Sequence, residues 1–261
     1  MLVGLQLSSL KRFTQTEAGM SAALRRVAEM GCTAVQLQWH SPEIPAAAVA
    51  RLLRQYGLRA LSVQDYTHEI LRQPDYYFTL AAACGCTDLC VSGIPADEMN
   101  AEGIRRFAMR LAPLGERAAR AGMTLSFHPR WQELAVIGAK TALAHLLDAA
   151  DASLRVLPDM NHVVRAGLEP AAFLASVAGR ADMLHCKDMT DAARESSHLV
   201  PAGRGCIDWE RVFPAARAAG IRCALTEQES FDGDAFTELS EGYHYLCGVN
   251  ARMETAAARA E

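Results

Sequence analysis

A unit of helix, glycine and short strand recurs along the chain, and this repeat limits the fold more than any other feature of the sequence. Each copy has an Ala-, Leu- and Arg-rich stretch, a glycine and then a short apolar run, as in AEMGCTAVQLQ, AACGCTDLCVS and ARAAGIRCALTE. Glycine just past a helix is a common stop, because it takes the left-handed conformation without a Cβ penalty. Strands that are apolar on both faces are typical of a parallel sheet covered by other elements.

The spacing of the repeat predicts the number of strands. Glycines that end the expected helices stand at Gly31, Gly57, Gly85, Gly122, Gly179 and Gly220, with Asp151 in the long gap before Gly179. Eight strands are expected over residues 2–7, 33–38, 59–63, 88–92, 124–127, 155–157, 183–185 and 222–226. Helices are expected between them, for example over residues 17–30, 101–121 and 209–219.

Eight strand–helix units in 261 residues predict an α/β fold, a single (β/α)8 TIM barrel over residues 1–261 with a short frayed C-terminal tail. The alternative is a doubly wound open sheet, which has fewer strands and often a Gly-rich loop after the first one. No G-x-G-x-x-G motif follows the first expected strand. The barrel is therefore the favoured fold.

Composition and charge narrow the class of protein. The formal net charge is -4 and the arginines are scattered, whereas a nucleic-acid-binding protein usually carries a basic face. The sequence has neither a signal-like leader nor an apolar window of membrane-spanning length, so we expect a cytoplasmic protein without a membrane partner. Cys84, Cys86 and Cys90 lack the paired C-x2-C arms of a structural zinc site and are interpreted as small buried residues.

Polar side chains gather where the expected strands end. In a TIM barrel, catalytic residues come from the carboxyl ends of the strands and the loops after them. Five of the eight histidines fall at this rim. The rim residues are Trp39, His40, Asp65, His68, His128, Glu133, Asp159, His162, His185, Lys187, Asp188, Glu227, Gln228 and Glu229.

Four rim residues suit one divalent metal ion. Glu133, Asp159, His185 and Glu227 come from the last four expected strands, one from each. Asp159 alone could be a helix N-cap, and a single strand-end histidine is usually a packed core residue, but four successive donors are hard to explain in this way. Three oxygen donors and one nitrogen favour Mn²⁺, with Mg²⁺, Co²⁺ or Zn²⁺ as alternatives.

The motifs around these residues resemble those of the xylose isomerase-like TIM-barrel superfamily, which contains sugar phosphate isomerases and epimerases and inosose dehydratases. GMTLSFHPRWQEL is similar to G-x-x-L-x-[YF]-H-N-H-x-x-E-[FL], with matches at His128 and Glu133, and LPDMNHVVRAGLEP is similar to D-x-x-[HW]-x-x-x-A-G-x-[DE]-P. LHCKD, VPAGRGCIDW and LTEQES resemble H-x-K-D, P-x-G-x-G-x-[IL]-D-W and V-x-E-Q-[DE]. The resemblance covers nearly the whole chain.

Three positions depart from the family pattern. Arg130 replaces the second histidine of H-N-H, and Arg204 stands where an acid is common. Either arginine could face a phosphate, carboxylate or carbonyl of the substrate, or could be a solvated loop residue. The histidine usual after the third strand is displaced to His68.

The resemblance implies a metal-dependent isomerase or epimerase acting on a small keto-sugar or sugar derivative. In related epimerases the metal binds two adjacent substrate oxygens and stabilises an enediolate, while two carboxylates pass protons. Glu133 and Glu227 are the expected catalytic pair. The expected substrate-binding residues are His128, His162, Lys187, Arg204, His68 and Trp39, with Lys187 alternatively a plain salt-bridge residue.

Other functions remain open on the sequence alone. The same machinery could run a lyase or dehydratase reaction, because the leaving group belongs to the substrate. A non-catalytic accessory barrel and a metal-dependent abasic-site endonuclease are further alternatives, and the latter would need more ligands and a basic surface. The expected partner is a small carbohydrate, and homo-oligomerisation through outer helices is common for this fold.

Overall fold

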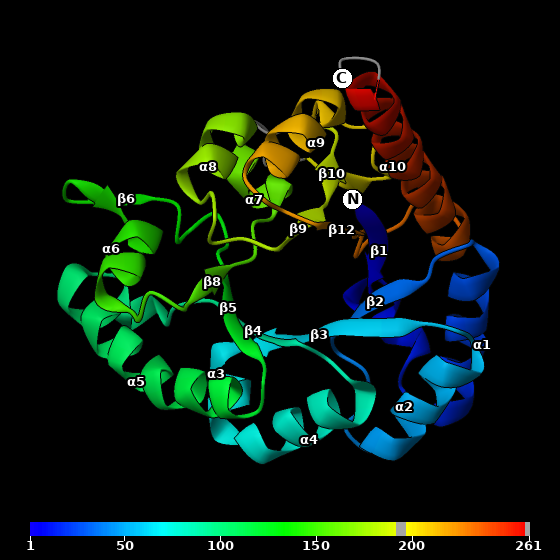
Figure 1. The fold of residues 1–261 in the computed structure, drawn as a ribbon, viewed down its shortest axis with the longest axis horizontal. Helices are drawn as coiled ribbons and strands as arrows, with labels where there is room; N and C mark the ends of the chain where they lie inside the picture. The colour runs from blue at the N-terminus through cyan, green and yellow to red at the C-terminus, as the bar shows by residue number, and fades with distance from the viewer. Residues whose placement is uncertain (192–196, 259–261) are drawn as a thin grey trace.

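A parallel sheet of eight strands closes on itself to form the centre of the molecule (Figure 1). The computed structural model describes residues 1–191 and 197–258. The order of the strands around the sheet is β8-β5-β4-β3-β2-β1-β12-β9. Their bounds are β1 Leu2–Gln6, β2 Ala34–Leu37, β3 Arg59–Tyr66, β4 Asp88–Ser92, β5 Thr124–His128, β8 Arg155–Val156, β9 Met183–Cys186 and β12 Cys223–Thr226.

The barrel closes between β8 and β9. The backbone N–H of Val156 donates to the carbonyl of Arg180 at 2.7 Å, and the N–H of His185 donates to that of Pro158 at 2.8 Å. A parallel bridge then joins Asp159 to His185. The closing seam therefore runs into two of the predicted metal ligands.

An outer helix follows each barrel strand, as the predicted (β/α)8 TIM barrel requires (Figure 1). These helices are α1 Glu17–Glu29, α2 Ala46–Gln55, α4 Pro74–Cys84, α5 Ala101–Arg120, α6 Ala142–Ala149, α8 Pro170–Ser176, α9 Trp209–Ala218 and α10 Ala235–Ala258. Every predicted strand overlaps an observed one, and the three predicted helices begin at the observed residues. The fold prediction is confirmed, and the open-sheet alternative is wrong.

Shorter helices and hairpins lie in the loops between the strands and the outer helices. They are the 3-10 helices η1 Leu7–Phe13 and η2 Ala96–Glu98, the helices α3 Thr67–Arg72 and α7 Met160–Arg165, and two hairpins, β6 Val136–Ile137 with β7 Lys140–Thr141 and β10 Asp188–Met189 with β11 Leu199–Val200. Several of them follow the carboxyl ends of barrel strands. The extra chain therefore lies at the end where catalytic residues of this fold are found.

The predicted glycine stops have the backbone conformation that the repeat requires. The six glycines at the ends of the repeat units have φ angles between 66° and 90°. Gly85, which caps α4, is the clearest case, with φ 70° and ψ 28°. A residue with a Cβ is strained in this region, which explains why glycine recurs there.

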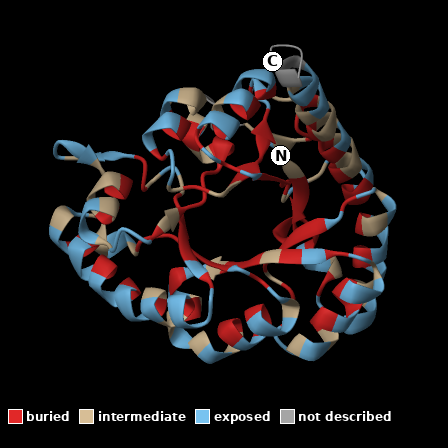
Figure 2. Cartoon of the chain, viewed as in Figure 1, coloured by how far each residue is buried: buried red, intermediate tan, exposed pale blue. Residues whose placement is uncertain are grey.

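Burial follows the two layers of the barrel (Figure 2). The strands are buried, while the outer helices bury the side facing the sheet and expose the other. On α10, the apolar residues Phe236, Leu239, Tyr243 and Leu246 are all buried. The helix continues through Met253 to Ala258, and the last three residues of the predicted tail lie outside the described part.

All eight cysteines are free thiols, and Cys86 and Cys90 are buried. Among residues 1–191 and 197–258, the one group of side chains placed to hold a metal contains none of them, in line with their interpretation as packing residues. No helix in these same ranges combines the length and apolarity needed to cross a bilayer.

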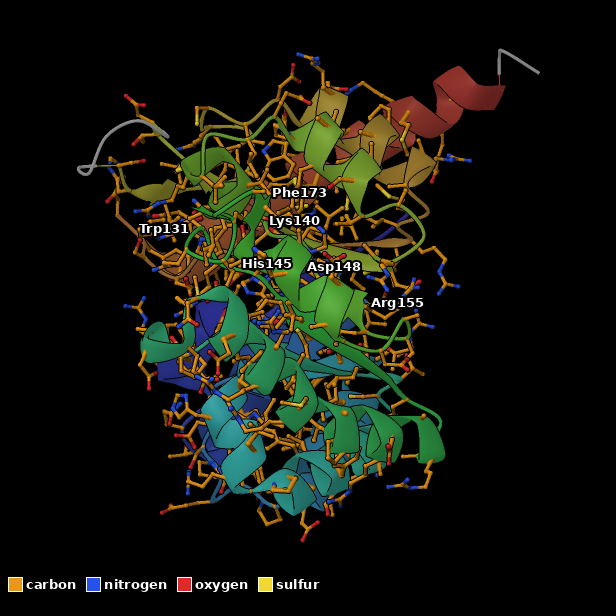
Figure 3. The ribbon with its side chains drawn as sticks, turned by 90° about the vertical axis from the view of Figure 1, so that its left-hand side faces the viewer. Trp131, Lys140, His145, Asp148, Arg155 and Phe173 are labelled. Atoms are coloured by element: carbon orange, nitrogen blue, oxygen red, sulfur yellow. The ribbon has the colours of Figure 1, made fainter. Side chains whose placement is uncertain are left out.

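The two ends of the barrel are distinct (Figure 3). Trp131 follows the carboxyl end of β5, and Arg155 begins β8; they lie at opposite ends of the barrel axis. The residues that follow the carboxyl ends of the strands lie at the mouth on the Trp131 side. The predicted site residues are found there.

Candidate metal centre

Four buried acceptor atoms lie at the carboxyl ends of neighbouring strands without any hydrogen-bond partner. They are Nε2 of His128, Oδ2 of Asp159, Nδ1 of His185 and Oε2 of Glu227. Each of these residues is at most 5% exposed. A buried polar atom left unpaired is costly, so four such atoms in one place indicate a group that is to be bound there.

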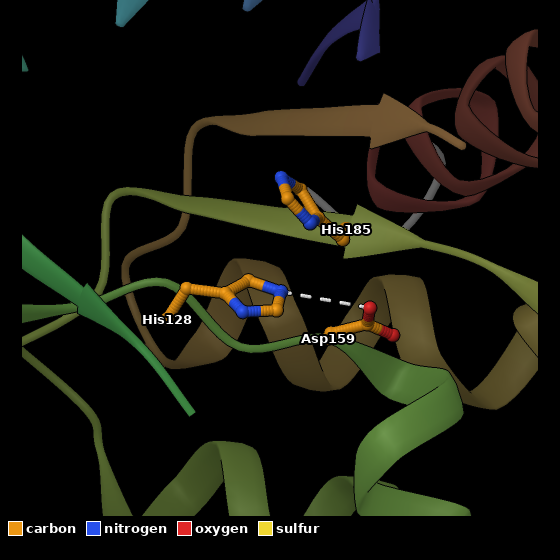
Figure 4. Close-up of side chains that lie close together, drawn as sticks. All are labelled: His128, Asp159 and His185. Carbon is orange, nitrogen blue, oxygen red and sulfur yellow. Dashed lines mark ion pairs between the residues drawn. The ribbon is translucent and has the colours of Figure 1, made fainter. Parts of the chain in front are cut away.

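His128 ends β5, His185 lies in β9, and Asp159 and Glu227 follow β8 and β12; Figure 4 shows His128, Asp159 and His185 close together. Nε2 of His128 is 3.6 Å from Oδ2 of Asp159, and Nδ1 of His185 is 2.9 Å from Oε2 of Glu227. The ligand atoms of His128, Asp159 and His185 lie within 4.8 Å of one another. Two imidazole nitrogens and two carboxylate oxygens fit one divalent transition-metal ion or zinc.

In the two residues nearest the barrel seam, one polar atom is held by the protein and the other is left free. Oδ1 of Asp159 accepts the backbone N–H groups of Asn161 at 2.8 Å and His162 at 3.4 Å, and so caps α7. Nε2 of His185 contacts Oε1 of Gln36 at 2.6 Å. Asp159 is therefore both an N-cap and a candidate ligand, through different oxygens.

In the other two candidate ligands, His128 and Glu227, one polar atom is likewise held by the protein and the other is left free. The hydroxyl of Ser92 lies 3.2 Å from Nδ1 of His128 and 3.3 Å from the backbone carbonyl of the same residue, so Ser92 holds this side of the ring. Nε2 of His128 is left without a hydrogen-bond partner. Oε1 of Glu227 accepts from the hydroxyl of Ser8 at 3.0 Å and from Lys187 at 3.1 Å, which leaves Oε2 free.

Lys187 supplies the positive charge beside the centre. Its ammonium lies 3.4 Å from Oδ2 of Asp159, 3.1 Å from Oε1 of Glu227 and 3.1 Å from Oε2 of Glu229. Burial alone would lower the pKa of Lys187, but these carboxylates outweigh it and raise the pKa well above the ordinary value. Lys187 is therefore a permanent cation here, as the salt-bridge alternative predicted.

Protonation at the centre suits metal binding. Burial alone would raise the pKa of Asp159 and of Glu227, yet the ammonium of Lys187 holds both pKa values below their ordinary range. Burial lowers the pKa of His128, and it lowers the pKa of His162 to about 3. Ionised carboxylates and neutral imidazoles are the forms that bind a metal ion.

Glu133 does not have the free carboxylate expected of a ligand. Its Oε1 accepts from the guanidinium of Arg130 at 2.8 Å and from the N–H of Ile94 at 3.0 Å. Its Oε2 accepts from the N–H of Arg130 at 2.8 Å and its Nε–H at 3.4 Å. His128, predicted to bind substrate, has a ring nitrogen without a hydrogen-bond partner. Glu133, predicted to bind the metal, forms an ion pair with Arg130.

The sequence contains a signal that the carboxylate of Glu133 is engaged by a neighbouring residue. Arg130 stands three residues before Glu133, where the family pattern has a histidine, and an arginine at that spacing can reach the carboxylate. Arg130 thus neutralises Glu133 and does not project alone toward a substrate. We therefore propose His128 in place of Glu133 beside Asp159, His185 and Glu227, which would give a set with two nitrogens.

The predicted substrate-binding residues lie in different places. His162 is next to the centre, with Nε2 3.8 Å from Oδ2 of Asp159. Trp39 and His68 flank Tyr66 after β2 and β3, with ring centroids 5.7 Å from it. Arg204 pairs with Glu241 of α10 and is largely exposed, so its contacts resemble those of a surface residue.

The H-x-K-D and P-x-G-x-G motifs form one structural unit around Asp188. Its carboxylate accepts from the indole of Trp209 at 2.8 Å, from the N–H of Gly203 at 3.0 Å and from that of Ile207 at 3.2 Å. A Cβ on Gly205 would lie 2.1 Å from Oδ1 of Asp188. Asp188 therefore organises the loop after β9, which explains this motif without a direct part in chemistry.

A cleft beside the centre gives room for a substrate. It has a volume of about 890 Å³ and is lined by Tyr66, His68, Ser92, Arg130 and Glu133, among others. Ser92 also contacts the ring of His128, so the cleft adjoins the centre. Small-molecule sites are usually concavities of this size.

Comparison with known proteins places the chain in a family. The model of the xylose isomerase-like TIM-barrel family matches residues 24–243, and the chain belongs to this family. No curated protein matches the sequence.

Solved structures with the same fold include several enzymes. A sugar phosphate isomerase/epimerase from Parabacteroides distasonis is 19% identical over 94% of this chain and 97% of that chain, with a TM-score of 0.77. An L-ribulose 3-epimerase is 15% identical over 99% of both chains, with a TM-score of 0.73. A probable 3-DHS dehydratase, AsbF from Bacillus anthracis, is 13% identical over 95% and 99%, with a TM-score of 0.72. At these identities the likeness shows the fold alone.

Proposed function

We propose that the protein is a metal-dependent isomerase or epimerase that acts on a small keto-sugar or sugar derivative. The observation that carries the proposal is the set of four buried, unpartnered acceptor atoms on His128, Asp159, His185 and Glu227. Membership of the xylose isomerase-like family and the fold shared with a sugar phosphate isomerase/epimerase support the substrate class.

The donor set favours Mn²⁺, Co²⁺ or Zn²⁺ over Mg²⁺, because two imidazole nitrogens suit borderline ions better than a hard one. When bound, such an ion would polarise the carbonyl of a keto-sugar and so acidify the adjacent C–H bond. The chain's own residues would then position the sugar and move the proton.

Glu227 would move that proton through Oε1, the oxygen not turned to the metal, once the substrate displaces its contact with Lys187. Its Oε1 faces Lys187 and Ser8, and its Oε2 faces the centre. Lys187, 3.1 Å from Glu227, would stabilise negative charge that develops on the substrate oxygens. His162, neutral at the edge of the centre, would bind a sugar hydroxyl.

Aromatic side chains would hold the apolar face of the sugar on the other side of the mouth. The strand order places β2 and β3 across the barrel from β8 and β9 (Figure 1). Trp39 follows β2 and Tyr66 ends β3, so both belong to the opposite half of the mouth, and Tyr66 lines the cleft beside the centre. Rings at a sugar site present a flat apolar surface that complements the C–H face of the pyranose or furanose.

A dehydratase is the second candidate, and the ion pair of Glu133 favours it. Epimerisation at one carbon needs proton-transfer groups on both faces, whereas Glu133 is engaged by Arg130. Elimination needs a base on one face of the sugar only, and Glu227 could supply it while the charge of Lys187 stabilises the developing anion. The fold shared with a probable 3-DHS dehydratase is consistent with this alternative.

Metal content tests the proposal first. Protein purified without added metal and then exposed to Mn²⁺ or Zn²⁺ should bind about one ion per chain, measured by plasma mass spectrometry. Asp159→Asn should lose the ion while its amide oxygen still caps α7. Glu169→Gln, at the exposed N-cap of α8, is the matched control and should keep the ion. A wild-type protein that takes up neither ion would overturn the proposal.

Deuterium exchange then separates the two reactions. A panel of keto-sugars incubated in D2O with the loaded protein should gain deuterium beside the carbonyl and yield isomers or epimers. Loss of water from the sugar with formation of a conjugated product would instead identify the dehydratase.

A further inference from the structure

A chain of buried polar side chains crosses the inside of the barrel from the metal centre to Asp88. Nε2 of His185 contacts Oε1 of Gln36 at 2.6 Å, and Nε2 of Gln36 donates to Oγ of Ser62 at 3.2 Å. The hydroxyl of Ser62 donates to Oδ2 of Asp88 at 2.7 Å. All four residues are at most 5% exposed, in the place where TIM barrels usually pack branched apolar side chains.

Asp88 fixes the direction of these hydrogen bonds. It accepts the hydroxyls of Ser62 and Ser126 on Oδ2 and that of Thr124 on Oδ1, at 2.7, 2.9 and 2.8 Å. A serine hydroxyl has one proton, and the contact of Ser62 with Asp88 is far shorter than its 3.4 Å contact with the carbonyl of Val63. Oγ of Ser62 therefore accepts from Gln36, which turns the amide nitrogen of Gln36 toward Ser62.

A second anchor fixes Gln36 from the other side. The backbone N–H of Ser8 donates to Oε1 of Gln6 at 3.3 Å, so the amide nitrogen of Gln6 is the atom that donates to Oε1 of Gln36, at 2.7 Å. Both anchors give the same result. Oε1 of Gln36 faces His185 and accepts a hydrogen bond from its Nε2.

We propose that Gln36, oriented by Ser62 with Asp88 and by Gln6, is a positioning residue that fixes the tautomer of His185. With its proton on Nε2, His185 must present the lone pair of Nδ1 to the centre, as a metal ligand requires. The proposal rests on the proposed metal-dependent function and adds residues of this chain that prepare the ligand before any ion arrives.

Removing Gln36 should let the proton move. Oε2 of Glu227 lies 2.9 Å from Nδ1 of His185, so a proton on Nδ1 would be accepted there at once. The hydrogen bond thus formed would occupy both ligand atoms and close the centre to a metal. Gln36 prevents this by holding the proton at the opposite ring nitrogen.

Nitrogen-15 NMR of the histidine rings in the metal-free protein, near pH 8, tests the tautomer directly. Wild type should show His185, assigned by comparison with His185→Asn, with Nε2 protonated and Nδ1 bare. Gln36→Met should move the proton to Nδ1, whereas Gln36→Glu, which keeps an acceptor oxygen, should leave it on Nε2. A wild-type proton on Nδ1, or no change in Gln36→Met, would overturn the proposal even if the protein binds metal well.

Two serine variants test the far anchor and remain informative if a Gln36 variant fails to fold. Ser62→Ala and Ser126→Ala each remove one buried hydroxyl from Oδ2 of Asp88, but only Ser62 also contacts Gln36. Titration with Mn²⁺ should give a roughly 10-fold weaker Kd for Ser62→Ala, in the range found for residues behind a metal ligand, and an unchanged Kd for Ser126→Ala. Equal Kd values for the two variants would remove Ser62 and Asp88 from the proposal. If no protein in the series binds Mn²⁺, the proposed function fails, while the NMR result still decides the tautomer.

Discussion

Nδ1 of His185 lies 2.9 Å from Oε2 of Glu227, and with the proton of His185 on Nε2 both atoms are acceptors. In this proposed tautomer Nε2 donates to Gln36, and the ammonium of Lys187 holds the pKa of Glu227 below its ordinary range against the effect of burial. Two lone pairs that face each other at this distance repel unless a cation lies against both. We therefore propose that the pair forms half of a cation site and that His128 and Asp159 form the other half.

The identity of the fourth ligand gives a direct prediction. His128→Gln should weaken binding of Mn²⁺ or Zn²⁺ at least about 10-fold, because it removes one of four ligand atoms. Glu133→Gln should change the Kd much less, because neither oxygen of Glu133 is free. Isothermal titration of both variants measures the difference, with circular dichroism to confirm that each is folded. An equal loss of metal in a folded Glu133→Gln variant would restore Glu133 as a ligand.

Lys187 should stabilise the metal-free protein strongly. It faces the carboxylates of Asp159, Glu227 and Glu229 in a buried site, so Lys187→Met leaves their charges uncompensated. Removing one partner of a buried ion pair typically costs about 3–5 kcal/mol. Denaturant unfolding of the metal-free variant should show a loss of this order, and added Zn²⁺ should restore more stability to the variant than to wild type.

A surface pair provides the control for this prediction. Lys140 pairs with Asp148 on the outside of the barrel, at 2.5 Å, with both side chains more than half exposed (Figure 3). Lys140→Met should change the free energy of unfolding by less than about 1 kcal/mol. A similarly small effect of Lys187→Met would mean that the centre does not depend on its cation.

The barrel could be predicted from the sequence because each level of the pattern agreed with the next. Glycine stops such as Gly85 require a positive φ, and apolar runs such as residues 88–92 require burial on both faces. The positions of Asp159 and His185 followed from the same reasoning, because the end of each strand fixes where the next side chains emerge. These are local properties of the chain.

The candidate ligand set could not be predicted in the same way, because it depends on which side-chain atoms already form hydrogen bonds or ion pairs in the folded protein. Glu133 matches the family motif, yet its carboxylate is taken up by Arg130 three residues away. His128 is expected from the sequence to hold substrate, and only the folded structure shows that its Nε2 has no hydrogen-bond partner. The link from His185 through Gln36 to Asp88 joins residues on four strands, and no local pattern indicates it.

His40 should make the protein sensitive to mild acid. Burial lowers the pKa of His40 from 6.5 to about 4, so the unfolded chain binds a proton between these values that the folded protein does not. The free energy of unfolding therefore falls as the pH drops from 6.5 toward 4, by about 3 kcal/mol from this residue. His40→Gln should match wild type at pH 7 and be more stable than it at pH 4 in urea unfolding.

Trp39 carries the last prediction, because its backbone is unusual. Among the described residues it is the one position other than glycine with a positive φ, 54°. Its indole donates to Oδ1 of Asp65 at 3.3 Å, and the ammonium of Lys11 lies 5.0 Å from the ring centre. Strain of this kind gathers at functional sites, where surrounding contacts hold the residue in place.

A pair of variants separates the backbone of Trp39 from its ring. Trp39→Ala and Trp39→Gly both remove the indole, but only glycine adopts the positive φ without strain, so the glycine variant should be about 1 kcal/mol more stable in urea unfolding. Both should raise KM about 10-fold for the sugar that exchanges deuterium, with kcat little changed, because a stacking ring binds substrate and moves no proton. A larger fall in kcat than rise in KM would instead assign Trp39 to the ordering of the reacting atoms. Equal stability of the two variants would show that the backbone relaxes once the indole is gone.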